Sequence, residues 1–270
     1  MQDLVILGIA MLATGCVAGV LAGLFGIGGG VVIVPVLEAV LAFLEVDPAI
    51  RMHVAVGTSL ATIIPTSISS ARAHHNRGAV DVDVVRRWAP FVFLGAVSGA
   101  WIASQVGSRV LAIVFATLAL ANAIKMVFFP RTRAVTSGVP RSAWVLVIPA
   151  TIGCASTMMG IGGGVFMVMV LTMFNEAIHR AVGTAALFGL VIAVPGTVGF
   201  VMAGWNHPAV PPFSLGYVSL VGFALIAPTT VLLAPVGARI AHAFDENRLR
   251  VLFGLFLITA SARLFYRAFA

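Results

Sequence analysis

The apolar runs of this sequence restrict it to very few folds. Residues 4–25 contain no charged side chain, and a run of about 20 such residues is long enough to cross a bilayer as a helix. Similar runs follow, so that 60% of the 270 residues are hydrophobic and 9% are charged. Soluble domains carry about 25% charged residues. We therefore predict an all-α polytopic membrane protein, because a helix pairs its own backbone amides inside the bilayer.

A glycine-rich pentapeptide occurs twice, each time between two apolar runs. The first copy is Gly26-Ile27-Gly28-Gly29-Gly30 and the second is Gly160-Ile161-Gly162-Gly163-Gly164; we call them the first and second glycine knots. Glycine permits unusual backbone angles and close approach of other atoms. A knot that opens a helix also presents free N–H groups at the positive end of the helix dipole, which favours an anion. The alternative is that the glycines only allow tight packing of membrane helices.

We expect about five helical segments in each half of the chain. In the first half they cover residues 4–25, 31–44, about 48–70, 88–106 and 110–129, with a polar stretch at 72–87. In the second half they cover 142–159, 165–174, a helix that ends near Gly204, 213–241 and 248–269.

The segment 165–174 is too short to span the membrane. Its ten residues make about 15 Å of helix, whereas the hydrocarbon core is about 30 Å thick. We therefore expect a half-helix that starts near mid-membrane at the second glycine knot. Irregular backbone at that depth must be buried in protein or line a cavity.

The basic residues predict that the two halves are inverted repeats. Loop 72–87 holds four Lys or Arg and its counterpart 205–212 holds none, whereas turn 106–109 holds one and its counterpart 239–250 holds three. An inverted arrangement places twelve of the sixteen basic residues on the cytoplasmic side, against ten for a parallel one, and basic residues favour that side.

The repeat divides the chain into three parts. We predict an N-terminal transmembrane repeat at residues 1–129, a cytoplasmic linker at 130–141 and a C-terminal transmembrane repeat at 142–270. Inverted repeats whose broken helices meet near the bilayer midplane are typical of secondary transporters.

The knots predict a substrate site for a small anion. Backbone amides of Gly28, Gly29 and Gly30 would face those of Gly162, Gly163 and Gly164 across the repeat axis. Two related segments follow the knots, Ala55-Val56-Gly57-Thr58-Ser59 and Ala181-Val182-Gly183-Thr184. The hydroxyls that we expect to donate to the anion are those of Thr58, Ser59, Ser156, Thr157 and Thr184. In the alternative, these hydroxyls bond their own backbone or a neighbouring helix.

Three titratable residues are candidates for proton transfer or gating. His53 and His179 each stand five residues before the paired threonines, and histidine titrates near neutral pH. An interfacial hydrogen-bonding role is the alternative for both. Glu38 lies inside an apolar run, and ionisable groups in a membrane are functional candidates by default.

Other binding partners are not indicated. Basic residues are scattered in ones and twos at the ends of apolar runs, which excludes a nucleic-acid surface. Cys16 and Cys154 lie in apolar runs without a neighbouring charge, so neither is expected to be reactive. We expect no cofactor and no metal. The predicted partners are the lipid bilayer, a small anion and a coupling proton.

The doubled knot, followed by Ala-Val-Gly-Thr-Ser in one half and Ala-Val-Gly-Thr-Ala in the other, resembles the sulfite exporter TauE/SafE family of bacterial membrane proteins. The likeness covers nearly the whole chain. It implies a multi-pass protein of the bacterial cytoplasmic (inner) membrane that moves a small sulfur-containing anion such as sulfite, sulfoacetate or another organosulfonate.

Two other readings remain open. One is a transporter or channel for another small anion or organic acid. The other is an intramembrane enzyme, such as a rhomboid-like protease or a thiol oxidoreductase. A protease of that kind needs a histidine deep in a span and an oxidoreductase needs a Cys-x-x-Cys motif, and the sequence has neither. We therefore expect a transporter that is not an enzyme.

Overall fold

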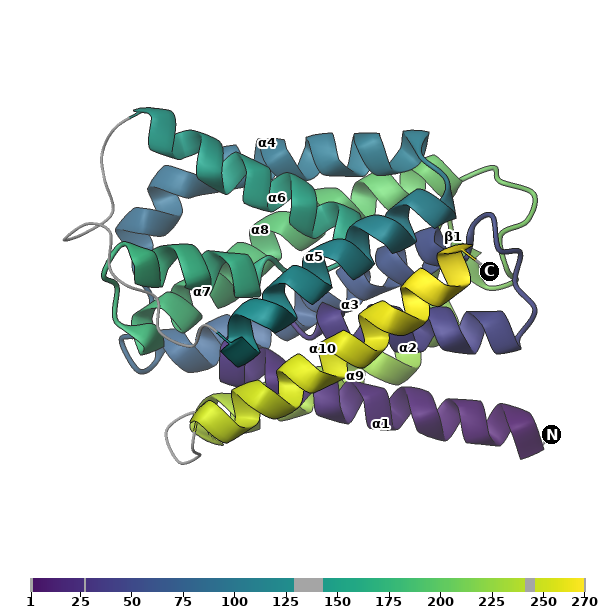
Figure 1. Ribbon diagram of the computed structural model, residues 1–270, viewed down its shortest axis with the longest axis horizontal. Helices are drawn as coiled ribbons and strands as arrows, with labels where there is room; N and C mark the ends of the chain where they lie inside the picture. Colours follow the sequence, from purple (N-terminus) through teal and green to yellow (C-terminus); the bar gives the residue numbers. More distant parts are fainter. Residues whose placement is uncertain (1, 27, 129–142, 241–245, 270) are drawn as a thin grey trace.

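The helices of the protein lie side by side along one axis. The computed structural model describes residues 2–26, 28–128, 143–240 and 246–269, and in them helix α1 begins and helix α10 ends at the same end of the bundle (Figure 1). The helices before residue 129 are α1 (Gln2–Phe25), α2 (Gly30–Phe43), α3 (Arg51–His75), α4 (Val82–Gln105) and α5 (Ser108–Phe128). Those after residue 142 are the short 3₁₀ helix η1 (Ala143–Leu146), α6 (Val147–Met159), α7 (Gly164–Met173), α8 (Ile178–Gly204), α9 (Leu220–Ile240) and α10 (Glu246–Phe269). The predicted all-α membrane fold is confirmed.

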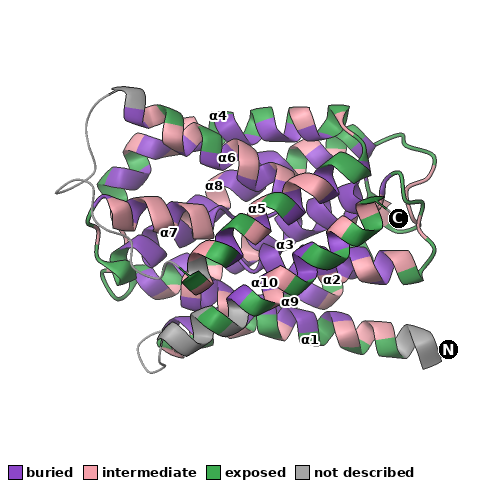
Figure 2. Cartoon of the chain, in the orientation of Figure 1, coloured by how far each residue is buried: buried purple, intermediate pink, exposed green. Residues whose placement is uncertain are grey.

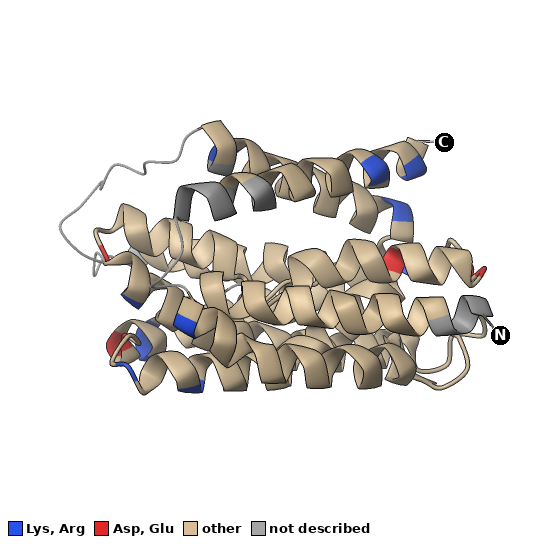
Figure 3. Cartoon of the chain, turned by 90° about the horizontal axis from the view of Figure 1, so that it is seen from below, with Lys and Arg blue, Asp and Glu red and all other residues tan. Residues whose placement is uncertain are grey.

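Five of the described helices are long and apolar enough to cross a membrane. They are α1 over Ile6–Phe25, α3, α5 over Ser108–Lys125, α8 and α9. Figure 3 shows that the charged residues of the described chain lie toward the two ends of the bundle, away from its middle. This distribution is what a bilayer requires, since a charge at its centre is costly.

Three apolar helices are too short to span, and two of them start at the glycine knots. Helix α2 has 14 residues and α7 has ten, so the predicted half-length helix after the second knot is confirmed. In Figure 1, α2 lies toward the end of the bundle where α1 begins, and α7 lies toward the opposite end.

Helix packing repeats between the two halves. Helix α1 packs on α9, and α6, the counterpart of α1, packs on α4; similarly α2 packs on α3 and α7 packs on α8. Helix α3 also packs on α9 and, equivalently, α8 packs on α4. Two further contacts join counterparts to one another, α3 to α8 and α5 to α10. A two-fold repeat produces such equivalent contacts in its two halves. The inverted relation of the halves and the repeat boundaries stay predictions. The predicted linker 130–141 lies outside the described residues.

The core surrounds α3 and α8 (Figure 2). Large side chains from several helices are fully buried there, and α3 is the most deeply buried of the candidate spans. They include Trp88, Phe115, Phe188 and Phe200. The buried faces of α3 and α8 lie in protein and not in lipid, which is where a substrate path has to run.

The predicted start of the span 213–241 is wrong. Residues 213–219 do not belong to a span: strands β1 (Ser214–Leu215) and β2 (Val218–Ser219) form a hairpin before α9. Phe213 and Gly216 have φ of 57° and 54°, and positive φ is incompatible with a continuing helix. The hairpin therefore ends before Leu220, where α9 begins.

The polar stretch 72–87 is also mostly helical. Helix α3 continues to His75 and α4 begins at Val82. The Asp81 carboxylate starts α4 by accepting a hydrogen bond of 3.0 Å from the Val84 amide, as an N-cap does. A helix can continue through polar residues at its ends, where it reaches water. Composition alone therefore ended α3 too early and started α4 too late.

Candidate functional site

Each glycine knot ends one helix and begins another. Gly29 immediately precedes α2 and Gly163 immediately precedes α7, and both have left-handed backbone, with φ of 78° and 71°. Only glycine adopts this conformation without strain. The first N–H groups of α2 and α7 have no acceptor within their own helix, so both helices present donors at the knots. Ile27 lies outside the described residues.

The two knots contact each other. A Cβ atom on Gly30 would overlap the carbonyl oxygen of Gly160, and one on Gly28 would lie 3.6 Å from the Cα of Gly162. Chain segments more than 130 residues apart therefore meet with no side chain between them. The structure brings the two knots together, and the predicted facing of their helix N-termini across an anion stays a prediction.

Ser59 fastens this contact. Its hydroxyl donates a hydrogen bond of 2.7 Å to the carbonyl oxygen of Gly160, and the side chain is completely buried. Ser59 belongs to α3, so the central helix of the first half is joined directly to the knot of the second. Its hydroxyl hydrogen is used by this bond, and its predicted role as a substrate ligand stays a prediction.

Two other predicted ligands are buried beside the second knot without a partner. Ser156 and Thr157 are 0% exposed, and neither hydroxyl has a hydrogen-bond partner in the described part of the chain. The Ser156 oxygen lies 3.2 Å from the position of a Cβ on Gly163. Other helical hydroxyls here bond a carbonyl one turn back, as Thr66 does to Thr62. An unpaired buried hydroxyl is costly, so Ser156 and Thr157 would both be stabilised by a hydrogen-bond partner from outside the chain.

A third unpaired hydroxyl, Ser67, was not among the predicted ligands. Ser67 is 1% exposed and has no described partner. It abuts Gly189 of α8, which in turn lies against the carbonyl oxygen of Gly162. The signal in the sequence was the run Thr66-Ser67-Ile68-Ser69-Ser70, a cluster of hydroxyls in the C-terminal half of a spanning helix.

The two Ala-Val-Gly-Thr segments act as clasps for loops. Thr58 accepts a hydrogen bond of 2.8 Å from the Ser219 amide, and Thr184 accepts one of 2.9 Å from the Asp81 amide. Ser219 immediately precedes α9, and Asp81 immediately precedes α4. Thr58 thus holds the residue before α9 and Thr184 holds the residue before α4, and these two helices are counterparts in the two halves.

The glycine before each threonine completes the clasp. A Cβ on Gly57 would lie 2.6 Å from the Tyr217 carbonyl oxygen, and one on Gly183 would overlap the carbonyl oxygen of Ala79. In both halves the carbonyl that approaches the glycine comes two residues before the amide that the threonine binds. These bonds occupy Thr58 and Thr184 away from the knots, and their predicted ligand role stays a prediction.

The histidines occupy different environments. His53 is 5% exposed, and its Nε2 lies 3.1 Å from the Ala103 carbonyl oxygen and 3.0 Å from that of Val106. Carbonyls only accept, so Nε2 carries the hydrogen, and the ring ties the start of α3 to the end of α4. His179 is exposed in the first turn of α8. A proton or gating role for either stays a prediction.

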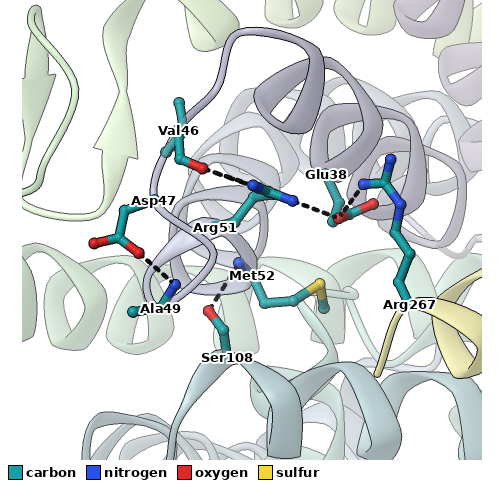
Figure 4. A network of polar contacts seen from close by, with 8 residues as sticks. All are labelled: Glu38, Val46, Asp47, Ala49, Arg51, Met52, Ser108 and Arg267. Atoms are coloured by element: carbon teal, nitrogen blue, oxygen red, sulfur yellow. Dashed lines mark hydrogen bonds and ion pairs between the residues drawn. The ribbon is translucent and has the colours of Figure 1, made fainter. Parts of the chain in front are cut away.

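Glu38 lies in a basic environment (Figure 4). One carboxylate oxygen accepts a hydrogen bond of 2.8 Å from Arg267 and lies 3.9 Å from Arg51. The other, Oε2, is buried without a described partner. A cavity of about 320 Å³ is lined by Glu38 together with Arg51, Arg109 and Arg267. Three arginines against one carboxylate make this cavity attractive to anions.

The knots themselves have a neutral lining. The atoms that come nearest to Gly28, Gly30 and Gly163 belong to uncharged residues such as Ile63, Ser59 and Ser156. Across the described residues, no group of three or more His, Cys, Asp or Glu is placed to hold a metal ion. The polar groups in reach are amides and hydroxyls, which can bind an oxyanion through hydrogen bonds alone.

Comparison with known proteins gives the family. A family model described as "Sulfite exporter TauE/SafE" matches residues 11–264. The chain belongs to the sulfite exporter TauE/SafE family. This TauE/SafE member is 36% identical over 256 residues to a probable membrane transporter protein of Haemophilus influenzae, with 95% of this chain and 97% of the relative covered.

More distant relatives of the TauE/SafE member carry the same description. A probable membrane transporter protein of Methanocaldococcus jannaschii is 23% identical over 249 residues, which are 90% of this chain and 89% of that protein. One of Bacillus subtilis, YdhB, is 27% identical over 193 residues, covering 69% of this chain and 76% of YdhB. No solved structure matches. Family and fold together identify a multi-pass membrane transporter.

Proposed function

We propose that this protein is a secondary transporter that moves a small sulfur-containing anion across the cytoplasmic membrane. The anion binds where the two glycine knots meet, between the N-termini of α2 and α7. Its ligands are backbone amides of Gly28–Gly30 and Gly162–Gly164 and the hydroxyls of Ser156, Thr157 and Ser67. The protein is a carrier and performs no covalent chemistry on the anion.

The unpaired hydroxyls carry this proposal. Ser67, Ser156 and Thr157 are each at most 1% exposed and lack described partners. Each such hydroxyl costs about 1–3 kcal/mol when it is left without a partner. An anion with oxygen atoms would accept hydrogen bonds from all three and remove that cost, which makes binding favourable in a site without a fixed charge.

The neutral lining suits transport better than an arginine would. A buried arginine would be costly whenever the site is empty and would also slow release of the anion. Each helix N-terminus supplies the equivalent of about half an elementary charge, so two of them offset much of a monovalent charge. Helix ends combined with hydroxyls therefore permit both binding and release.

The sulfur in the substrate rests on the family. Its description names sulfite, and sulfite, sulfoacetate and other organosulfonates all present a small oxygen-bearing sulfur group of the kind that the knots would bind. A coupling proton stays a prediction. The Glu38 carboxylate is ion-paired with Arg267 and lies close to Arg51, and both ring nitrogens of His53 lie within hydrogen-bond distance of described partners.

Flux measurements in proteoliposomes test the proposal. Purified protein is reconstituted, and uptake of ³⁵S-sulfite and of an isotopically labelled organosulfonate is followed with and without a pH gradient. Acetate and phosphate serve as competing anions. We expect saturable sulfur-anion flux that Ser156→Ala and Thr157→Val reduce, with Ser104→Ala, an exposed serine far from the knots, as the control.

Other outcomes separate the alternatives. Flux of acetate with none of sulfite would support a carrier for organic acids. Flux that never saturates would indicate a channel. Chemical conversion of the anion without its movement would indicate an enzyme and would overturn the proposal.

A further inference from the structure

A groove between α3 and α9 is separate from the knots. It has a volume of about 580 Å³ and is lined by residues from the last three turns of α3, the residues that follow it and the last three turns of α9. The lining residues are Pro65, Ile68, Ser69, Arg72, Ala73, Asn76, Arg77, Val231, Pro235 and Arg239. Nothing in the proposed transport mechanism uses it.

The two ends of the groove differ in polarity. Pro65, Ile68, Val231 and Pro235 make an apolar inner wall. Arg72 and Arg239 lie in the last turns of α3 and α9, and Pro65 is seven residues before Arg72, which corresponds to roughly 10 Å along the helix. The groove is therefore amphipathic, with a basic rim about 10 Å above an apolar floor.

Among the described residues, the arginines of the rim have no acidic partner. The lining includes no Asp or Glu, and no described ion pair involves Arg72, Arg77 or Arg239, whereas Arg180 at the same end pairs with Asp81 at 2.8 Å. Arg77 donates a hydrogen bond of 3.1 Å to the Ala238 carbonyl oxygen, which holds one guanidinium at the groove. Three positive charges thus face an anion from outside the chain.

The apolar surface continues beside the groove. Ile68, Leu232 and Val236 are 43%, 72% and 37% exposed, and all three belong to helices that are apolar and long enough to span a membrane. Exposed apolar side chains on such helices face lipid. The groove consequently meets hydrocarbon along its length and the aqueous surface at its rim.

We propose that this groove binds an anionic phospholipid, with the phosphate on the rim arginines and the upper acyl chain along Pro65, Ile68 and Val231. Basic pockets between membrane helices on the cytoplasmic side bind anionic headgroups, and the basic bias predicts that this end of the bundle is cytoplasmic. A small free oxyanion would leave the apolar wall and most of the volume unused. An amphiphile with one negative head fills both parts.

Lipid binding to the purified protein tests the inference without any transport assay. Thermal unfolding in detergent is measured with added phosphatidylglycerol, with phosphatidylcholine of the same acyl chains, and with inorganic phosphate at matched ionic strength. Native mass spectrometry counts bound lipid independently of stability. We expect saturable stabilisation and one retained lipid with phosphatidylglycerol, and neither with the other two.

Arginine variants locate the site. Arg72→Gln and Arg239→Gln should each weaken phosphatidylglycerol binding about fivefold, since a basic residue near an anionic headgroup is worth about 1 kcal/mol. Arg86→Gln is the matched control, because Arg86 is exposed near the start of α4 at the same end and does not line the groove. If all three variants lose phosphatidylglycerol binding equally, the lipid responds to the general surface charge and the proposed site is wrong. If inorganic phosphate stabilises the protein as much as phosphatidylglycerol does, the groove binds small anions and the lipid proposal is wrong.

Discussion

The Ser59 hydroxyl donates a 2.7 Å hydrogen bond to the carbonyl oxygen of Gly160. This single bond joins the central helix of the first half to the knot of the second, at the place where Gly30 leaves no room for a side chain. The two knots therefore meet through backbone atoms and this one hydroxyl, in a contact that leaves no room for a larger residue than glycine at position 30.

Ser59→Ala should destabilise the protein. The substitution leaves the buried Gly160 carbonyl without its donor, and an unmet buried acceptor costs about 1–3 kcal/mol. Thermal unfolding in detergent measures the loss, with Ser104→Ala as control because Ser104 is exposed and bonds its own helix. Equal stability of the two variants would mean that this bond does not hold the halves together.

Bulky residues in the knots should abolish transport while leaving membrane insertion intact. Gly29→Val and Gly163→Val each place a β-branched residue at positive φ, and the new Cβ would lie 2.8 Å from the Ala18 carbonyl oxygen in one case and overlap Ile192 in the other. Gly8→Ala is the control, since nothing lies within 4 Å of its Cβ position. The measurement is anion flux at matched membrane expression. Normal flux in both valine variants would mean that the knots serve only helix packing and that the substrate binds elsewhere.

Ser156→Ala and Thr157→Val should separate stability from function. Both remove a hydroxyl that has no described partner, so the melting temperature should stay the same or rise. Anion affinity should fall by about tenfold for each, as for a lost hydrogen bond of about 1.5 kcal/mol to a charged group. The test pairs a melting curve with the concentration dependence of flux. If the melting temperature falls while the affinity for the anion is unchanged, Ser156 and Thr157 stabilise the fold and do not bind the anion.

Thr58→Val and Thr184→Val should behave in the opposite way. Each leaves a loop amide, that of Ser219 or Asp81, without its acceptor, at a cost of about 1–3 kcal/mol. The melting temperature should drop in both variants by similar amounts, because the two clasps are equivalent. The affinity of the protein that remains folded should change little. A large loss of affinity with unchanged melting would restore the two threonines as ligands.

Glu38 and Arg267 should be energetically coupled. Glu38 is 4% exposed and its ion pair with Arg267 spans 2.8 Å. Only the Glu38 side of this pair is buried, since the Arg267 side chain is 37% exposed. Arg267→Gln leaves the buried carboxylate without its nearest cation and Glu38→Gln removes the ion pair, so each variant should destabilise and the double variant should lose less than the sum. We expect a coupling of about 0.5–3 kcal/mol from denaturant unfolding. Arg263→Gln, on the same helix and exposed, should show none.

Much of the fold can be predicted from short stretches of the sequence. Apolar run lengths identified the membrane class, and the ten-residue run after Gly163 gave the half-length of α7. Boundaries such as that at Leu220 were missed, because positive φ at Phe213 and Gly216 arises from hairpin packing that apolar composition does not reveal.

By itself the sequence determined the membrane helices, the duplicated knots and the family, because these follow from composition, spacing and motif. Only the tertiary structure decided which hydroxyls are occupied. Thr58 and Ser59 are adjacent, yet one holds a loop amide and the other the Gly160 carbonyl, whereas Ser67, Ser156 and Thr157 pair with nothing described. A hydroxyl bonds whatever packing brings within about 3 Å, and its partners here lie 101 and 161 residues away, which no local pattern encodes.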